Sequence, residues 1–349
     1  MVPLVDLSRR SVALLPEYEA AVRKILTSGH VLLGPELRAF EAEFAAFAGH
    51  RFAVGVASGA TALQLVLATL DLQPGDEVLV PAMTAVPTAS AVLAAGGTPR
   101  FVDVDPHTAT VPGNAWERAR TSRTRAVVPV HLYGRPADPA ATDLPVLEDA
   151  AQAHGALCPA RTSSLATAYS FYPTKNLGGV GDGGAIVTDD EALVARLRRL
   201  RVHGMAEQYV HVERSQNFRM SELESAWLRL ALRTLPAGNR RRREVAAAYR
   251  VAAPHLRWQT DHPDHVHHLA VFRTTNRDRV RNQLTAAGVS TSVHYPLALT
   301  QQPAYRDLAT DPCPEAEGWA AECVSVPCFP ELTDDEVAIV CTALREVES

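Results

Sequence analysis

The amine of Lys175 is the side chain in this sequence best suited to covalent chemistry on a carbonyl group. Only two of the 34 basic residues are lysines, Lys24 and Lys175, and the other 32 are arginines. A lysine can lose its proton and attack a carbonyl carbon to form an imine, whereas arginine stays protonated. Lys175 follows an apolar segment and precedes five glycines within 178–184, where the backbone could approach a ligand closely. The alternative is a surface lysine kept by chance, as Lys24 could be.

Two other segments offer groups that could bind the rest of a charged ligand. Ser58 ends one apolar segment and precedes an apolar helical pattern. We therefore expect the backbone amides of Gly59, Ala60 and Thr61 at the positive end of a helix dipole, where a phosphate binds well. Asp149 ends a second apolar segment, which presents its carboxylate to a ligand. Each segment could also do no more than cap a helix or a turn.

These three groups have a specific use when they occur together. A phosphate anchor, a carboxylate that pairs with a ring nitrogen and an amine that captures an aldehyde are the groups needed to hold pyridoxal 5'-phosphate. The sequence therefore predicts an enzyme that uses this cofactor.

The elements that must position these residues alternate between strands and helices. Helical patterns occupy 36–49 and 189–204, the second beginning on aspartate and ending at Gly204. Such alternation predicts a largely parallel sheet covered on both faces, with ligands at the carboxyl ends of its strands. The strands are expected within 51–58, 76–81, 98–105, 125–132, 144–150, 167–172 and 184–189.

The length of 349 residues predicts two domains. Residues 1–235 are expected to form a large α/β domain that binds the cofactor, with a mostly parallel seven-stranded sheet and a last helix that ends at Pro236. Residues 236–349 are expected to form a smaller α+β domain, with strands within 267–275 and 288–296.

Composition excludes several classes of function. A net charge of −5 argues against a general nucleic-acid surface, and we interpret the run Arg240 to Arg243 as a solvated or subunit-facing helix. Hydrophobic residues make up 47% and charged residues 21%, as in an ordinary globular protein. Neither an apolar run of about 18 residues nor a secretory signal is evident, so we expect a cytoplasmic protein that does not enter the membrane.

Cysteines and histidines give little indication of a metal site. The odd number of cysteines and the lack of a CxxC pair indicate neither a disulfide framework nor a thiolate zinc site. We expect the cysteines to be buried among apolar residues. His265 and His267 could hold a metal from one face of a strand, but no third spaced ligand is evident, and no metal is predicted. The five cysteines are Cys158, Cys313, Cys323, Cys328 and Cys341.

Nearly the whole chain resembles the DegT/StrS family of sugar aminotransferases, which belong to fold type I of the pyridoxal-phosphate enzymes. An ordered set of blocks carries this resemblance and is much more specific than any single block. The blocks include SGHVLLGPELRAFEAEFAAFAG, ASGATAL, VPVHLYGRPAD, LEDAAQAHGA, SFYPTKNLGGVGDGGAIVT, SQNFRMSELESA, VHYPLALTQQPAY and VPCFPELTDDEV.

The resemblance implies a role for each matching residue. Lys175 would bind the cofactor covalently and later move a proton, and Asp149 would pair with the pyridine nitrogen. Gln152 is expected beside the phenolic oxygen of the cofactor. The phosphate would be held by Gly59, Ala60 and Ser170.

The resemblance also implies a homodimer with its active site at the subunit interface. Asn217 would reach the phosphate bound by the neighbouring subunit. Substrate contacts are expected from Arg219, His294 and Tyr295, with Tyr209 and His211 as further candidates.

Three positions depart from the family's pattern. Ala60 stands where threonine is usual, with Thr61 behind it, so a hydroxyl contact to the phosphate is expected to move. Ala85 stands where many relatives place an aromatic ring that stacks on the cofactor, so stacking must be weaker or come from elsewhere. Thr300 stands where relatives often carry histidine, so sugar recognition is expected to differ there.

The predicted function is transfer of an amino group from L-glutamate (or glutamine) to a nucleotide-linked keto-6-deoxysugar in aminosugar biosynthesis. The same chemistry on a cyclitol ketone is the alternative. Relatives that act as sugar dehydratases lack the imine-forming lysine, so Lys175 argues against that activity. A nicotinamide-dependent oxidoreductase is disfavoured because no GxGxxG motif follows the first strands. A non-catalytic binding protein is disfavoured by the complete set of cofactor residues.

Overall fold

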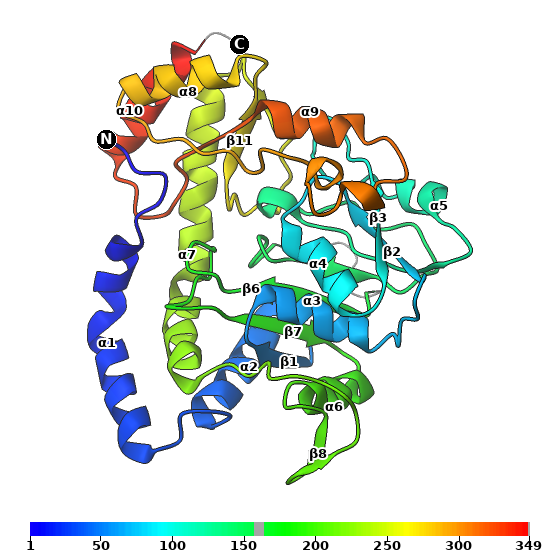
Figure 1. The fold of residues 1–349 in the computed structure, drawn as a ribbon. Coiled ribbons are helices and arrows are strands. Elements are labelled where there is room, and N and C mark those ends of the chain that lie inside the picture. Colours follow the sequence, from blue (N-terminus) through cyan, green and yellow to red (C-terminus); the bar gives the residue numbers. More distant parts are fainter. Residues whose placement is uncertain (157–163, 348–349) are drawn as a thin grey trace.

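The computed structural model describes residues 1–156 and 164–347 of the chain (Figure 1). Its helices are α1 (Leu7–Ser28), α2 (Pro35–Ala48), α3 (Gly59–Ala68), α4 (Val86–Ala94), α5 (Ala115–Ala119), α6 (Glu191–Leu200), α7 (Glu222–Ala252), α8 (Arg277–Ala286), α9 (Pro314–Glu322) and α10 (Asp334–Arg345). Its strands are β1 (Phe52–Val56), β2 (Glu77–Pro81), β3 (Thr98–Val102), β4 (Thr124–Val127), β5 (Leu147–Asp149), β6 (Ala166–Ser170), β7 (Gly184–Thr188), β8 (Met205–Glu207), β9 (Val210–His211), β10 (Arg257–Trp258), β11 (Ala270–Arg273) and β12 (Cys323–Val326).

Each of the seven segments predicted as strands of the large sheet overlaps a strand, and β4 and β6 each begin one residue before the predicted segment. They pair as a four-stranded sheet in the order β1-β7-β6-β5 and a three-stranded sheet in the order β3-β2-β4. Parallel bridges from Val127 to Val146 and from Val130 to Asp149 join the two sheets between β4 and β5. Among these seven strands, β7 is the one that runs antiparallel to its neighbours, β1 and β6. The prediction of a mostly parallel α/β sheet is confirmed.

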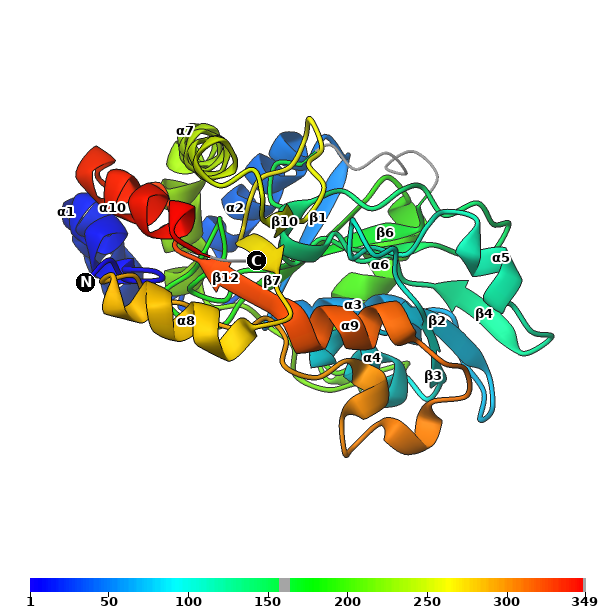
Figure 2. The same ribbon diagram turned by 90° about the horizontal axis from the view of Figure 1, so that it is seen from above.

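The two faces of the four-stranded sheet carry different helices (Figure 2). In β7, the side chains of Ala185 and Val187 join a buried cluster that includes residues of α2 and α7. Ile186, between them, joins a second cluster that includes residues of α3. Because side chains alternate between the two faces of a strand, one apolar strand fills both cores.

The direction of three strands brings the predicted site residues to one edge. Since β7 is antiparallel to both β1 and β6, those two strands run in the same direction, and β5 is parallel to β6. Their carboxyl ends therefore meet. Gly59, Asp149 and Ser170 stand at these ends.

Helix α7 is longer than the sequence indicated. We expected it to end at Pro236, but it runs on to Ala252 with Pro236 inside it. Proline in a helix costs about 3 kcal/mol, which packing of the helix against α1, α2 and α10 outweighs. A division between residues 235 and 236 remains a prediction. The buried cluster beyond it spans residues 245–347 but also includes Val2.

Three local expectations were wrong. Segment 288–296 forms no strand. Val289 forms a single bridge with Val2, and Ser292 forms a single bridge with Ser325, so no continuous ladder develops. Helix α6 ends at Leu200, before Gly204, although Asp190 caps its start as expected. Arg242 is buried and donates to the backbone carbonyls of His267, His268 and Cys328, so the arginine run is not wholly solvated.

Two compositional expectations can also be compared with the structure. Cys313, Cys323, Cys328 and Cys341 are buried free thiols, as predicted, and Cys158 lies outside the described residues. Over residues 1–156 and 164–347, the helices are too short or too polar to span a lipid bilayer.

The carboxylate of Glu222, at the start of α7, fixes the start of α2. It accepts hydrogen bonds from the backbone amides of Gly34, Glu36 and Leu37 at 2.9, 2.8 and 3.0 Å. Because Gly34 is the N-cap of α2 and has no side chain to cap it, Glu222 supplies the acceptor from another helix.

We predict that Glu222→Ala lowers the free energy of unfolding by about 3 kcal/mol or more, because three buried amides lose their acceptor. Urea unfolding followed by circular dichroism measures the change. Glu244→Ala, at an exposed position of the same helix, is the matched control and should change the free energy by less than about 0.5 kcal/mol. Equal effects of the two substitutions would contradict this role of Glu222.

Candidate active site

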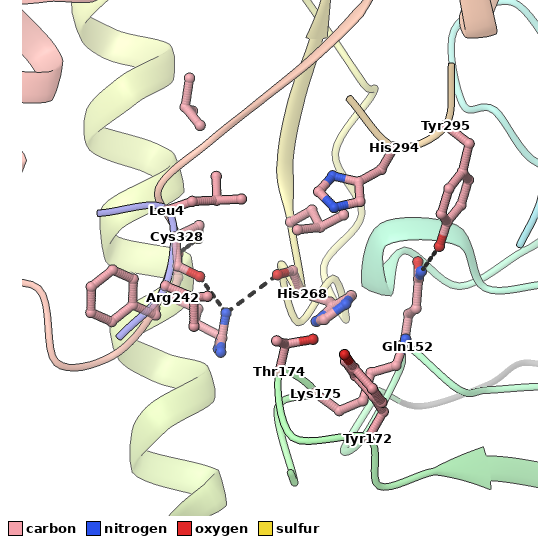
Figure 3. A pocket seen from close by; sticks show the side chains of 14 residues that line it. Leu4, Gln152, Tyr172, Thr174, Lys175, Arg242, His268, His294, Tyr295 and Cys328 are labelled. Atoms are coloured by element: carbon pink, nitrogen blue, oxygen red, sulfur yellow. Dashed lines mark hydrogen bonds between the residues drawn. The ribbon is translucent and has the colours of Figure 1, made fainter. Parts of the chain in front are cut away.

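The turn after β6 places the amine of Lys175 inside the protein (Figure 3). The Lys175 amide donates to the carbonyl of Tyr172 at 2.8 Å, and Arg10 of α1 donates to the carbonyl of Pro173 at 3.0 Å. Burial lowers the pKa of Lys175 from 10.5 to about 8, although the Asp149 charge acts in the opposite direction. A larger share of this amine is therefore neutral near pH 7 than in an exposed lysine.

Asp149 at the end of β5 is a buried carboxylate held by two donors. The Thr88 hydroxyl donates to Oδ2 at 2.9 Å and the Ala151 amide donates to Oδ1 at 3.1 Å. Burial raises the pKa of Asp149, while these hydrogen bonds and the charge of Lys175 lower it. Asp149 and Lys175 line the same cavity, of about 290 Å³. The cavity thus has one acidic and one basic group.

The N-terminus of α3 forms another wall of this cavity. Gly59 and Ala60 line it, together with Ser170 of β6. A Cβ atom on Gly59 would lie 2.5 Å from Ser170 Cβ, so only glycine allows this close approach. The Thr61 amide donates to Ser58 Oγ at 3.2 Å, which corrects our expectation that this amide is available to a ligand.

Gln152 connects the cavity to the segments that surround it. Its Oε1 accepts a hydrogen bond from the Tyr133 amide at 2.6 Å, and its Nε2 donates to the Tyr295 hydroxyl at 3.0 Å (Figure 3). The Tyr133 hydroxyl donates to the carbonyl of His294. These bonds fix the side-chain amide and the position of segment 294–295 together.

A second cavity, of about 240 Å³, adjoins the first. Gln152, Tyr172 and Lys175 line both cavities, and His294 and Tyr295 line the second. His294 Nδ1 lies 2.9 Å from Ser325 Oγ of β12, and burial lowers the pKa of His294 to about 4. Neutral His294 and Tyr295 therefore face the space beyond the Lys175 amine, and their contacts with a substrate remain a prediction.

The remaining predicted site residues lie apart from these cavities. Asn217 and Arg219 precede α7, and Arg219 Nε donates to Asn217 Oδ1 at 2.8 Å. Tyr209 and His211 belong to the β8–β9 hairpin and are exposed. Within the described part of one chain, none of the four lines either cavity. Their roles remain predictions.

The structure shows the surroundings of Ala85 and Thr300, two of the positions that depart from the family's pattern. Ala85 lines the first cavity at the N-cap of α4, where its methyl group adds little contact area. The Thr300 hydroxyl donates to Glu317 Oε1 at 3.0 Å, in the short helical turn Leu299–Gln301.

Sequence reasoning missed four residues that support the site. Thr88 and Tyr133 bind Asp149 and Gln152 as described, and His268 lines the second cavity. Glu224 of α7 accepts hydrogen bonds from Val180 and Gly181 in the glycine segment, and burial raises its pKa to about 7. Thr88 and Glu224 carried no distinct signal, because their partners are 61 and more than 40 positions away in the sequence.

Comparison with known proteins identifies the family. The family model described as the DegT/DnrJ/EryC1/StrS aminotransferase family matches residues 14–345. The chain belongs to this family. The resemblance predicted from the sequence is thus confirmed, and with it an aminotransferase that depends on pyridoxal phosphate.

Curated relatives and solved structures are similar over nearly the full length. The chain is 43% identical to dTDP-3-amino-3,4,6-trideoxy-alpha-D-glucose transaminase of Streptomyces venezuelae, covering 99% of this chain and 96% of the relative. It is 39% identical to UDP-N-acetyl-3-dehydro-alpha-D-glucosamine 3-aminotransferase of Acidithiobacillus ferrooxidans, covering 99% and 97%.

Two solved structures show the same fold. That of S. venezuelae DesV in complex with a ketimine intermediate has a TM-score of 0.95 and 42% identity, covering 99% of this chain and 98% of that one. That of ntda from Bacillus subtilis with bound cofactor PMP has a TM-score of 0.91 and 29% identity, covering 98% and 84%. The prediction of fold type I is confirmed.

The first cavity fits the cofactor. The close approach of Gly59 to Ser170 leaves the amides at the start of α3 beside a hydroxyl, a donor set that suits a phosphate. Asp149 can pair with a protonated ring nitrogen, and Lys175 can capture the aldehyde. When bound, pyridoxal phosphate supplies an electron sink for charge that develops on a substrate carbon.

We predict that, in protein stripped of cofactor, the rate at which Lys175 captures added pyridoxal phosphate rises with pH and levels off near pH 8. The neutral amine is the attacking form, so below its pKa the rate falls about tenfold per pH unit. Stopped-flow absorbance measures the rate, and Lys175→Ala should show no covalent capture. A rate that keeps rising up to about pH 10.5, the ordinary lysine pKa, would contradict the effect of burial.

Proposed function

We propose that this protein transfers an amino group from L-glutamate (or glutamine) to C3 of a nucleotide-linked keto-6-deoxysugar. The observation that carries the proposal is the half-buried Lys175 side chain, which lines both the cofactor cavity and the adjoining cavity. A cofactor in the first cavity and a substrate in the second would both be within reach of the Lys175 amine.

Lys175 has the properties of the base that moves the substrate proton. With a pKa of about 8, its amine can accept a proton from carbon and return it near neutral pH. The carboxylate of Asp149 would keep a ring nitrogen protonated, which favours withdrawal of electrons from the substrate carbon. Gly59, Ala60 and Ser170 would hold the phosphate and so orient the ring relative to Lys175.

The names of the similar proteins support the class of acceptor. Both curated relatives described above are named for nitrogen at C3 of a nucleotide-linked sugar. In this chain, His294 and Tyr295 line the space where the keto group would reach Lys175. A neutral imidazole and a phenol can hydrogen-bond to sugar hydroxyls without placing a fixed charge beside the carbonyl.

A homodimer is part of the proposal. Asn217 and Arg219 would complete the phosphate and substrate sites of the neighbouring subunit. Exposed apolar side chains support a subunit interface, because Val180 in the glycine segment is 48% exposed and Tyr209 is 84% exposed.

We predict amination of a dTDP- or UDP-linked 3-keto sugar with glutamate as the donor. The assay offers a panel of dTDP-, UDP- and GDP-linked 3-keto and 4-keto sugars together with inosose ketones, and mass spectrometry detects each product. NMR then locates the new amine. Lys175→Ala controls for background amination. Turnover of an inosose with none of the nucleotide sugars would support the cyclitol alternative and contradict this substrate class.

We predict that two inactive variants regain activity when mixed if the active site is shared between subunits. Lys175→Ala removes the amine, and the double variant Asn217→Ala/Arg219→Ala removes the groups that would act in the partner's site. Random reassortment of equal amounts leaves about a quarter of all sites intact. Refolding the two together and assaying turnover measures the recovery, with each variant refolded alone as the control. Absence of recovery would show that Asn217 and Arg219 act within their own subunit.

A further inference from the structure

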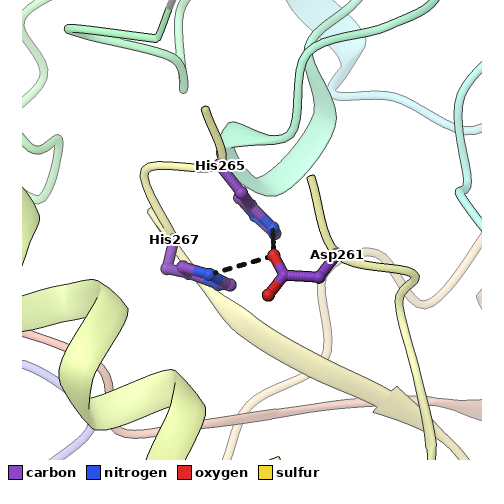
Figure 4. Close-up of side chains that lie close together, drawn as sticks. All are labelled: Asp261, His265 and His267. Atoms are coloured by element: carbon purple, nitrogen blue, oxygen red, sulfur yellow. Dashed lines mark hydrogen bonds and ion pairs between the residues drawn. The ribbon is translucent and has the colours of Figure 1, made fainter. Parts of the chain in front are cut away.

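Three polar side chains outside the active site converge on one point (Figure 4). Asp261 follows β10, and His265 and His267 lie in the loop that leads to β11. His265 Nδ1 and His267 Nε2 are each 3.3 Å from Oδ1 of Asp261. The possible ligand atoms of all three residues lie within 4.8 Å of one another.

The two polar neighbours of the His265 ring cannot both receive a hydrogen bond from it while the ring is neutral. Nδ1 faces the carboxylate of Asp261, and Nε2 lies 3.3 Å from the backbone carbonyl of Tyr133. Both are acceptors, whereas a neutral imidazole carries one N–H. A second N–H would make the ring a cation, which is disfavoured because the ring is 1% exposed and stacks on His267 at 3.7 Å between ring centroids. One nitrogen lone pair therefore faces an oxygen.

A bound metal ion would resolve this conflict. Nε2–H of His265 would donate to the Tyr133 carbonyl, and the lone pair of Nδ1 would bind the metal. Histidine ligands of metals usually donate their other N–H to a carbonyl or carboxylate in this way.

The two nitrogen-to-oxygen spacings are compatible with a tetrahedral ion. Zinc bonds of about 2.0–2.1 Å to nitrogen and oxygen place neighbouring ligand atoms of a tetrahedron roughly 3.3–3.4 Å apart. Octahedral bonds of similar length would place them about 3.0 Å apart. Both nitrogen-to-oxygen distances in the cluster are 3.3 Å.

We propose that Asp261, His265 and His267 bind one Zn²⁺ ion, with water as the fourth ligand. Water can reach the site because the Asp261 side chain is 53% exposed, while the two histidine rings are buried. Arg250 Nε lies 4.0 Å from the other oxygen, Oδ2, and Oδ1 also accepts a hydrogen bond from the His262 amide at 2.9 Å, which leaves it a lone pair for the metal.

The position of the site indicates a structural role. His265 contacts the carbonyl of Tyr133, whose amide donates to Gln152 in the cofactor cavity. The ion would hold loop 261–267 against the turn Leu132–Gly134. The sequence predicted no metal because it showed no third spaced ligand for His265 and His267. These two residues were also expected on a strand, whereas the strand begins only at Ala270.

Zinc titration of the tag-free holoenzyme, after dialysis against a chelator, tests the proposal. We expect one tightly bound Zn²⁺ per chain by elemental analysis and by competition with a chromophoric chelator. Asp261→Asn, at the exposed ligand, and His267→Ala should each raise the Kd by at least about 100-fold. Co²⁺ in place of Zn²⁺ should give the visible absorption of a tetrahedral site in the wild type and in neither of these two ligand variants.

Two controls separate this site from other histidines. His262→Ala changes a neighbouring ring in the same loop, whose Nδ1 accepts from the Asp264 amide, and His294→Ala changes an active-site ring. Both should keep the stoichiometry and the Kd of the wild type. Failure of the wild type to bind Zn²⁺, or unchanged affinity in Asp261→Asn, would overturn the proposal.

Discussion

The direction of β7 is the constraint on which the site depends. This strand runs antiparallel between β1 and β6, so the chain can return across the sheet and still leave β1, β5 and β6 pointing the same way. Their carboxyl ends then place a helix N-terminus, Asp149 and the turn to Lys175 around one cavity. If any of these strands ran in the opposite direction, its carboxyl end would lie at the other edge of the sheet, one strand length away from the other groups.

Burial of opposite charges in this cavity needs specific support. An ionised carboxylate or an ammonium group is costly to remove from water unless hydrogen bonds or an opposite charge accompany it. The donors to Asp149 come from α4 and from the residue two positions later in the chain. Burial lowers the pKa of Lys175 more than the charge of Asp149 raises it. Because burial raises the fraction of neutral amine, it also makes the amine available as a nucleophile and base.

Helix α7 supports the site at several levels because it is long and continuous. Near its start, Glu224 accepts from the glycine segment and Trp227 donates to the carbonyl of Gly178 at 2.9 Å. Farther along, Asn239 Nδ2 donates to the carbonyl of His154 at 2.7 Å, and Arg242 donates to the carbonyl of His268 at 3.4 Å. A helix broken at Pro236 could not hold the glycine segment and the second cavity in a fixed relation.

The sequence by itself determined the seven strands of the large sheet, the order of the chemical groups and the cofactor. Apolar runs of five residues bounded by turn signals specify β1 and β7 locally. In parallel sheets, ligands bind at the carboxyl ends of the strands, so the residues at those ends could be chosen as candidates. Lys175 and Asp149 could be identified because their residue types are needed for the chemistry and their positions follow apolar strands.

Only the tertiary structure decided the features that depend on partners far apart in the chain. Thr88 reaches Asp149 across 61 positions, Glu222 reaches the start of α2 across 185 or more, and Asp261 meets His265 and His267 through a loop that local patterns assigned to a strand. Packing against α1, α2 and α10 likewise carries α7 through Pro236, against its local preference. Local periodicity reports which residues can be buried, but the identity of a buried polar group's partner is set when separate elements pack together.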